Sequence, residues 1–207
     1  MEENTIEKGT PERILAAAAQ VFAESGYEGA RVDEIARQAG VNKAALYYHI
    51  GGKQVLYAQV LNRLLGEAAS RTVQTMRDKD DPEEQLRIYI RNIAKNIDQQ
   101  PHLPPIMLRE IASGGKHIPE ELVKHMADMV AMLAAVISKG AAQGKFIAAQ
   151  PFIVHIMIIT SIIFHKSSRA VRMRFNVFPE EIRNQDADVS GPVADEIERL
   201  IFRALKK

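Results

Sequence analysis

The sequence predicts an all-α protein with an N-terminal helix-turn-helix head of three helices and a C-terminal helical body, about nine helices in all. Apolar residues recur at three- and four-residue spacing, which is the period of an amphipathic helix. Glycine and proline interrupt this pattern where helices are expected to begin and end. Because 46% of the 207 residues are hydrophobic, the chain can bury a core and a globular fold is expected.

The first helix of the head is predicted to begin at Thr10, where a capping hydroxyl precedes a proline and an acid. It is predicted to end at Gly26, and residues 1–9 before it are expected to form a flexible polar tail. A second helix is expected at residues 32–39. Gly40 then supplies a tight turn, because glycine adopts a left-handed backbone conformation easily.

A third short helix is expected at residues 42–49, with Leu46 and Ile50 on its packing side. Two glycines follow it and interrupt the chain again. Two short helices joined by a tight turn form a helix-turn-helix, a motif that places its second helix in the major groove of DNA. Residues 10–53 are therefore predicted to be a DNA-binding domain.

Residues 54–207 are predicted to form the helical body. Prolines followed by acids indicate several of its helix starts, and glycines indicate several of its helix ends. A cluster of three prolines, Pro101, Pro104 and Pro105, predicts a rigid break between two helices. The expected helices cover residues 53–77, 82–98, 106–112, 119–143, 151–171 and 193–205, with a short helical turn after Pro179.

The segment at residues 152–164 admits two interpretations. It is rich in β-branched residues, which favours a buried strand. No other segment offers it a partner strand, and its length suits a helix buried on most sides, so a helix is predicted. Its thirteen residues are too few to span a bilayer, and no membrane partner is expected.

Composition favours a cytoplasmic protein. The chain has no cysteine, which fits a reducing compartment, and its polar start lacks the apolar run of a signal peptide. The net charge is only +1, and the first 53 residues hold six basic and eight acidic residues, so overall charge does not predict a nucleic-acid partner. The distribution is more informative, because residues 35–66 contain no acid but include Arg37, Lys43, Lys53 and Arg63.

The third helix carries polar and aromatic groups suited to bases and phosphates. Lysine can donate to guanine, asparagine can pair with adenine, and an alanine methyl can meet a thymine methyl. Lysine at the start of the next helix suits a phosphate. In the alternative interpretation the tyrosines belong to the core, but Leu46 and Ile50 already fill the packing positions. The candidate DNA contacts are Asn42, Lys43, Ala44, Ala45, Tyr47, Tyr48, His49 and Lys53.

The run Val-Asn-Lys-Ala-Ala-Leu-Tyr-Tyr-His-Ile-Gly-Gly-Lys, residues 41–53, closely resembles the third helix and the start of the fourth in the tetracycline-repressor (TetR) family. The motif resemblance covers about residues 10–60, and the remainder resembles the family in helix count, order and length. Matched to the family motif, Tyr47 and His49 are expected to contact phosphates, with Tyr48 nearer the groove.

One departure from the family pattern is Arg31, which stands where members often carry a hydroxyl residue that caps the second helix and touches phosphate. Arg31 can itself reach a phosphate and joins the candidate DNA contacts. The resemblance implies a homodimer, most often a repressor released from a palindromic operator by a small apolar or amphipathic effector. It implies that residues 54–207 bind the effector and dimerise, and it implies no cofactor.

The last two long helices usually form the dimer interface in the family. The residues expected there have intramolecular packing as their alternative role. They are Ile156, Ile159, Ile163, Ile197, Leu200, Ile201 and Leu205.

The sequence indicates the effector site less clearly than the DNA contacts. Methionines suit adaptable pockets among the middle helices, although methionine at helical spacing is more often plain core. Residues 130–179 contain six Lys or Arg and no acid, which suits either an anionic effector or a solvated face. The candidates are Met107, Arg109, Glu110, Met126, Met129, Met132, Phe146, His155 and Phe164.

An enzyme is not expected. The sequence has no metal-ligand spacing, no phosphate loop and no nucleophile elbow, and its six histidines are scattered, so neither a metal nor a cofactor is predicted. The alternative function is an all-helical small-molecule-binding protein or enzyme whose helix-turn-helix serves protein contact. Salt distinguishes the two, because DNA binding weakens steeply as salt rises.

Overall fold

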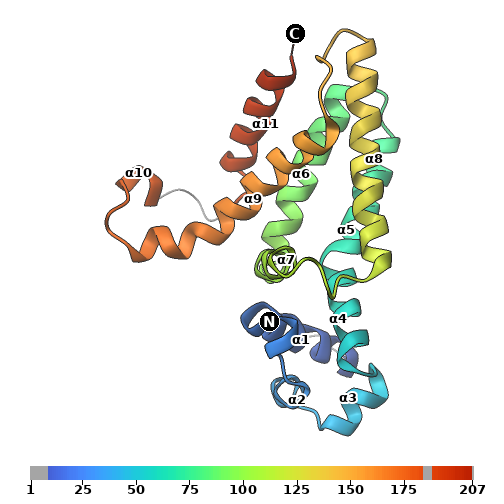
Figure 1. The fold of residues 1–207 in the computed structure, drawn as a ribbon, viewed down its shortest axis with the longest axis vertical. Coiled ribbons are helices and arrows are strands. Elements are labelled where there is room, and N and C mark those ends of the chain that lie inside the picture. The colour runs from blue at the N-terminus through green and yellow to red at the C-terminus, as the bar shows by residue number, and fades with distance from the viewer. Residues whose placement is uncertain (1–8, 184–187, 207) are drawn as a thin grey trace, which may run out of the picture.

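The computed structural model describes residues 9–183 and 188–206, and within them all regular structure is helical apart from one isolated bridge. The predicted all-α class is confirmed. A small head carries the N-terminus at one end of the molecule, and the long helices of the body extend from it (Figure 1). The predicted tail at residues 1–9 lies outside the described residues except for Gly9.

The helix α4, the π-helical turn η1 and α5 follow one another without a break, as the sequence predicts for residues 53–77. If this continuous rod is counted as one helix, the described residues form ten helices. The sequence predicts nine, and the short α10 accounts for the difference. In chain order the elements are α1 (Thr10–Gly29), α2 (Val32–Ala39), α3 (Lys43–His49), α4 (Lys53–Leu61), η1 (Asn62–Gly66), α5 (Glu67–Arg77), α6 (Pro82–Gln99), α7 (Leu103–Ala112), α8 (Glu120–Ala142), α9 (Pro151–Arg174), α10 (Glu180–Arg183) and α11 (Pro192–Leu205).

The head is built around α1, which packs against α2, α3 and α4. At Gly26 the backbone leaves the helical conformation with a φ of 68° and a ψ of 177°, which confirms the predicted end of the first regular helix. Gly40 adopts the predicted left-handed conformation with a φ of 66°. The N–H of Val41 then donates to the carbonyl oxygen of Ala36 at 3.0 Å, which closes α2 and turns the chain into α3.

Two clusters of buried apolar side chains hold the molecule together. The head cluster contains side chains from α1, α2, α3 and α4. It also includes Leu103, Ile106 and Met107 from α7 and Leu122 from α8. The body cluster lies among α5, α6, α8, α9 and α11. The predicted domain boundary at residue 53 falls inside the head cluster, because α4 and α7 are needed to cover α1.

The helix α7 begins earlier than the sequence predicts. Three prolines suggest a break followed by a helix from about residue 106, yet α7 starts at Leu103 and contains Pro104 and Pro105. The N–H groups of the first helical turn have no internal partners, so prolines are accommodated there without losing a hydrogen bond. The predicted start of this helix is therefore wrong by about one turn.

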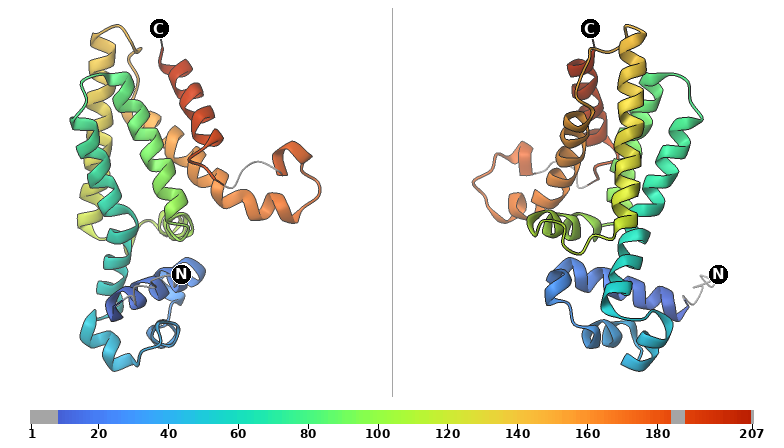
Figure 2. Two further views of the ribbon diagram at one scale, coloured as in Figure 1. Left: turned by 180° about the vertical axis from the view of Figure 1, so that it is seen from behind. Right: turned by 45° about the vertical axis from the view of Figure 1, so that its right-hand side comes forward.

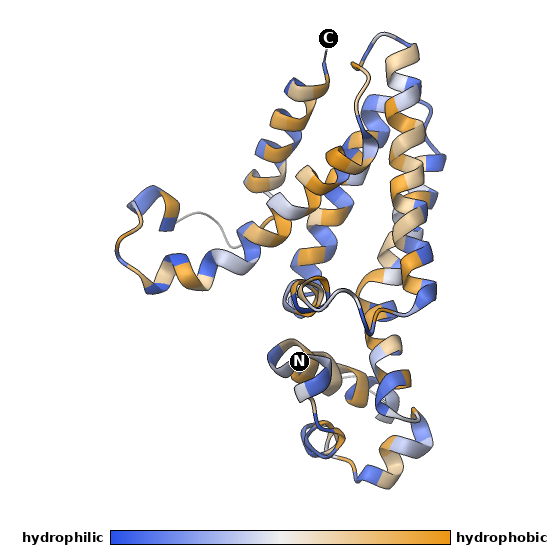
Figure 3. Ribbon diagram, in the orientation of Figure 1, coloured by the Kyte–Doolittle hydropathy of each residue, from blue (hydrophilic) through white to orange (hydrophobic). Residues whose placement is uncertain are grey.

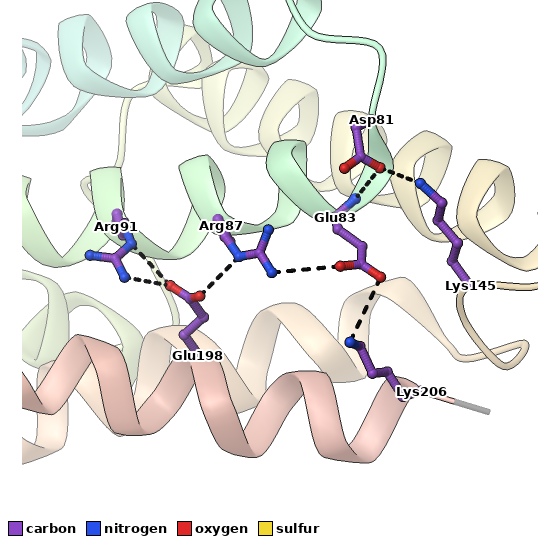
Figure 4. A network of polar contacts seen from close by, with 7 residues as sticks. All are labelled: Asp81, Glu83, Arg87, Arg91, Lys145, Glu198 and Lys206. Atoms are coloured by element: carbon purple, nitrogen blue, oxygen red, sulfur yellow. Dashed lines mark hydrogen bonds and ion pairs between the residues drawn. The ribbon is translucent and has the colours of Figure 1, made fainter.

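Ion pairs fasten α11 to α6 along its length (Figure 4). Glu198 accepts from the Nε atoms of Arg87 at 3.1 Å and Arg91 at 2.9 Å. Glu83 lies 3.5 Å from Nη2 of Arg87 and 3.9 Å from Nζ of Lys206. Partly exposed pairs stabilise little one by one, but this network fixes how α11 lies along α6.

The connection between α8 and α9 lies at the end of the body away from the head (Figure 1). Phe146 in this connection is buried. Its ring covers Gly140, where any Cβ atom would overlap the ring. The ring also packs at 6.1 Å from the ring of Phe202, and the N–H of Ile147 donates to the carbonyl oxygen of Leu205 at 2.7 Å. These contacts fix the C-terminal helix against the connection between α8 and α9.

The ambiguous segment at residues 152–164 is helical, as predicted, and belongs to α9. Its buried side, which includes Val154, Ile158 and Ile162, packs against α6, α8 and α11. The second half of α9 extends away from the body together with α10 (Figure 2). By length and composition α9 is also long and apolar enough to cross a membrane, in contrast to the prediction from its shorter apolar run.

Candidate nucleic-acid interface

The helix α3 lies at the outer tip of the head, with one side against the core and the other in solvent (Figure 1). Leu46 and Ile50 are buried in the head cluster, as predicted. Tyr47 is 46% exposed and Tyr48 is 86% exposed. The interpretation of the two tyrosines as core residues is therefore wrong, and a rigid helix holds both rings at the surface.

Asn42 caps α3. Its Oδ1 atom accepts a hydrogen bond from the N–H of Ala45 at 2.7 Å, which is a preferred use of asparagine at this position. Pairing with adenine requires both the oxygen and the amide nitrogen of the side chain. Because the oxygen is engaged within the helix, donation from the amide nitrogen to a phosphate or base acceptor is the contact that needs no change in the cap.

Lys43 meets an acid from the preceding helix. Its Nζ atom lies 3.0 Å from Oδ1 of Asp33, and both side chains are exposed. The hydrogen bond to Asp33 raises the pKa of Lys43, so the ammonium stays charged. Although residues 35–66 contain no acid, Asp33 lies beside this face, because the turn at Gly40 folds α2 back against α3.

The remaining small and polar candidates also lie at the surface. Ala44 and His49 are exposed, Ala45 is half-buried, and the ring of His49 stands edge-on to that of Tyr48 at 5.2 Å. Arg31 is exposed at the N-cap position of α2 and makes no capping hydrogen bond there with its side chain. Its guanidinium is therefore not committed to the helix end.

Lys53 is the most constrained of the candidates. It is half-buried at the start of α4, where its Nζ atom donates to the carbonyl oxygen of Glu28 at 3.3 Å and lies 4.7 Å from the centre of the Tyr27 ring. The unpaired N–H groups at the start of α4 give this end of the helix a partial positive charge. A phosphate placed there would meet both the N–H groups and the ammonium.

The structure does not bring the nine effector candidates together. The apolar members are divided between the two cores and the surface. None of the nine lines the groove between α9 and α11 or the groove between α6 and α11. Their content of methionine and aromatic rings mainly reflects packing. Met107 belongs to the head cluster, and Met126 packs against it. Met129 and Phe146 belong to the body cluster, Met132 packs against it, and Phe164 is exposed on α9.

His155 is a buried histidine with a polar partner. The hydroxyl oxygen of Tyr89 on α6 lies 2.6 Å from its Nδ1 atom. Burial lowers the pKa of His155, so the imidazole is neutral in the folded protein. The two side chains form a polar pair inside the otherwise apolar body.

Arg109 and Glu110 lie at the junction of the body with the head. Arg109 donates from Nη2 to the carbonyl oxygen of Glu24 on α1 at 2.9 Å. Glu110 is only 3% exposed and accepts a hydrogen bond from the hydroxyl of Tyr57 on α4 at 2.7 Å. Glu110 is thus not a solvated residue, and both side chains are used for contact between the two parts of the molecule.

The lysines of the basic stretch at residues 130–179 pair with acids from other elements. Lys145 lies 2.6 Å from Asp81, and Lys166 lies 2.6 Å from Asp98. Figure 4 shows the first of these pairs beside the start of α6. These contacts favour a structural role for these lysines over the attraction of an anionic effector.

Most of the dimer-interface candidates pack within their own chain. Ile156 and Leu200 are exposed, and Ile159 is half-buried. A groove of about 310 Å³ runs between α9 and α11 and includes Ile153, Met157 and Ala204 in its lining. The intramolecular alternative is correct for the four buried candidates, Ile163, Ile197, Ile201 and Leu205.

The fold and the exposed α3 define a helix-turn-helix protein with a helical body. Residues 14–60 match the bacterial regulatory proteins of the tetR family, and residues 61–205 match the C-terminal region of YcdC-like proteins. The chain belongs to the TetR family of bacterial regulators.

Similar proteins agree with this assignment. Among curated relatives, the transcriptional repressor NicS of Pseudomonas putida is 29% identical over 139 residues, which are 66% of this chain and 66% of NicS. Among solved structures, the hemolysin II transcriptional regulator HlyIIR has a TM-score of 0.71 at 24% identity, covering 96% of this chain and 97% of its own. FadR from Bacillus subtilis, solved with stearoyl-CoA, has a TM-score of 0.69 at 18% identity, covering 93% and 98%. Both solved structures share the fold of this chain.

Proposed function

We propose that the chain is a ligand-responsive transcriptional regulator that acts in the cytoplasm as a repressor at a palindromic operator. The observation that carries this proposal is the exposure of Tyr47 and Tyr48 on a helix whose other side is buried. Large aromatic side chains held in solvent by a rigid element are typical of a binding surface. In a helix-turn-helix such a helix enters the major groove. The repressor NicS supports repression as the mode of action.

We assign roles by position in the head. Lys43 and Tyr48 lie on the exposed side of α3, where base edges are reached, and the methyl groups of Ala44 and Ala45 can meet thymine. Phosphates would be bound at the edges of this surface, which orients the head without reading sequence. The proposed phosphate contacts are Arg31, Asn42, Tyr47, His49 and Lys53.

Variants of the head test the proposal on a duplex recovered by selection from random DNA. Lys43→Ala and Tyr48→Ala should reduce the preference for this duplex over a scrambled one. Lys53→Ala should weaken binding to both duplexes equally and reduce the salt slope by about 0.9, because it removes one phosphate contact. If wild type binds both duplexes equally, or binding does not weaken as salt rises, the head serves protein contact as in the alternative function.

The dimer is proposed to form through α9 and α11. Part of the side of α9 that its own chain leaves uncovered is apolar, and α11 adds exposed apolar residues. Hydrophobic residues recur along both helices (Figure 3). A second copy related by a two-fold axis would cover this surface and place two heads on the two halves of a palindrome. The exposed residues proposed for this contact are Phe152, Ile153, Ile156, Met157, Leu200 and Ala204.

The effector is proposed to be a small apolar or amphipathic molecule bound in the body. The pair Tyr89 and His155 supplies a polar anchor in an apolar core, and Met129 and Met132 pack at that core. The stearoyl-CoA complex of FadR supports an acyl effector for this fold. Stearoyl-CoA added to the protein–DNA complex should release the DNA, and Tyr89→Phe should require a higher concentration. Release at the same concentration from wild type and variant would contradict this anchor.

A further inference from the structure

A compact polar contact joins the head to the body at the buried carboxylate of Glu110. The side chain projects from α7 and is almost fully covered. Its Oε1 atom accepts the hydroxyl hydrogen bond of Tyr57 at 2.7 Å, and its Oε2 atom accepts the backbone N–H of His117 at 3.2 Å. The ring Nδ1 atom of His117 lies 3.4 Å from Oε1. A single carboxylate therefore connects α4 of the head with α7 and with the segment that precedes α8.

The same region also contacts the C-terminal part of α1. The ring of His117 stacks on that of Tyr27 with centres 4.0 Å apart, and its Nε2 atom lies 3.1 Å from Oε1 of Glu28. Arg109, the neighbour of Glu110, donates to the carbonyl oxygen of Glu24. Two head helices, α1 and α4, are thus contacted from the body by three adjoining side chains.

Among the residues of this contact, Tyr57 makes the hydrogen bond that depends most clearly on burial. Burial raises the pKa of Tyr57, and the hydrogen bond to Glu110 raises it further, so the phenol stays neutral and remains a donor. Hydrogen bonds to charged groups in a desolvated site stabilise more than exposed ones. The apolar contacts around this site lack the directionality of these bonds, so they define the angle between the head and the body less sharply.

We propose that Glu110, Tyr57 and His117 form a polar clasp that holds the head in the orientation that binds an operator. The clasp lies between the proposed DNA surface and the body, so any movement of α7 relative to α4 must break or remake it. This assigns Glu110 a positioning role in place of effector contact. The inference rests on the proposed dimeric DNA-binding function.

The test uses phenylalanine substitutions at Tyr57 and Tyr27, whose rings meet edge to face with centres 4.9 Å apart. Tyr57→Phe removes only the hydroxyl that donates to Glu110, whereas Tyr27→Phe removes a hydroxyl for which the described residues provide no hydrogen-bond partner. A spin label at Ala16→Cys, an exposed position on α1, reports the distance between the two heads of a dimer. Labelling is specific because the chain contains no cysteine.

Tyr57→Phe should broaden the distribution of head-to-head distances, and Tyr27→Phe should leave it as in wild type. Because fewer molecules then have the competent head spacing, Tyr57→Phe should weaken binding to the selected duplex by about tenfold, the change expected if one hydrogen bond to a charged group fixes the orientation. Glu110→Gln, which keeps an acceptor for Tyr57 but not two charged oxygens, should show a smaller change in the same direction.

The clasp is contradicted if Tyr57→Phe lowers the melting temperature but leaves the distances and the affinity unchanged, or if it tightens DNA binding. Failure of the proposed function has a different signature. Without a dimer, no dipolar signal is observed, and without DNA recognition, wild type itself does not prefer the selected duplex.

Discussion

In the free protein, Lys43 and its ion pair determine the charge on the exposed side of α3. Its ammonium is exposed, yet it is paired with Asp33 of the preceding helix. In the proposed DNA complex, a base or phosphate would compete with this carboxylate, and the charge of Asp33 would oppose the DNA backbone. The lysine and its place on the helix are predictable from the sequence. The pairing is not, because it depends on the angle between α2 and α3, which brings together two residues ten positions apart in the chain.

Asp33→Asn is predicted to strengthen binding to cognate and scrambled duplexes alike, by several-fold at low salt, because it removes a negative charge and releases Lys43. The salt slope should become steeper. Glu12→Gln, which removes an exposed acid at the start of α1, is a matched control and should change the affinity less. Fluorescence anisotropy across a salt series measures both quantities. Unchanged or weaker binding by Asp33→Asn would show that the Asp33–Lys43 pair does not oppose DNA.

His155 is predicted to make the stability of the body depend on pH. Its pKa in the folded protein lies below the ordinary value of 6.5, so the unfolded chain takes up a proton first as the pH falls. The free energy of unfolding should therefore decrease as pH falls below about 6.5. The double variant Tyr89→Phe/His155→Leu leaves neither partner unpaired and should lose this part of the dependence. Urea unfolding at several pH values measures it, and parallel curves for the two proteins would contradict the assignment.

At the scale of elements, α7 and α9 show what helical sequence patterns predict and what they do not. The sequence predicts both as helices, but it places the start of α7 after its prolines, since a proline cluster alone does not reveal which residues form the first turn. For α9 the apolar pattern predicts a helix buried on most sides, yet Phe152, Ile153 and Met157 remain exposed. Periodicity shows that a face is apolar and does not show whether the same chain or a second copy covers it.

Met157→Glu is predicted to separate the dimer, because it places a charge on the exposed apolar face of α9. Val123→Glu makes the same change at an exposed apolar position on α8 and should leave the dimer intact. Gel filtration with light scattering at micromolar concentration measures the mass of each variant. A Met157→Glu protein that remains dimeric would exclude the proposed face.

Viewed as a whole, the molecule joins a reading head to a body through a shared core and a polar clasp. The head is almost fully predictable, since its turns, caps and packing residues are local features of one continuous segment. The effector residues are not, because a pocket is assembled from helices distant in sequence, and methionines or charged pairs chosen from the sequence fall into cores and junctions. Glu110 is the clearest example, because its isolated position in the sequence gives no sign of its partner Tyr57, 53 residues earlier.

The central claim is that two copies of α3 read the two halves of a symmetric duplex. Selection of bound sequences from random DNA by the full-length protein tests it most directly, because the recovered motif reports base preference, symmetry and half-site spacing together. We predict an inverted repeat with its half-sites about one helical turn or more apart, and loss of base preference within each half-site when Tyr48→Ala is used. Recovery of no enriched motif, or of a single half-site without its inverted partner, would contradict the account.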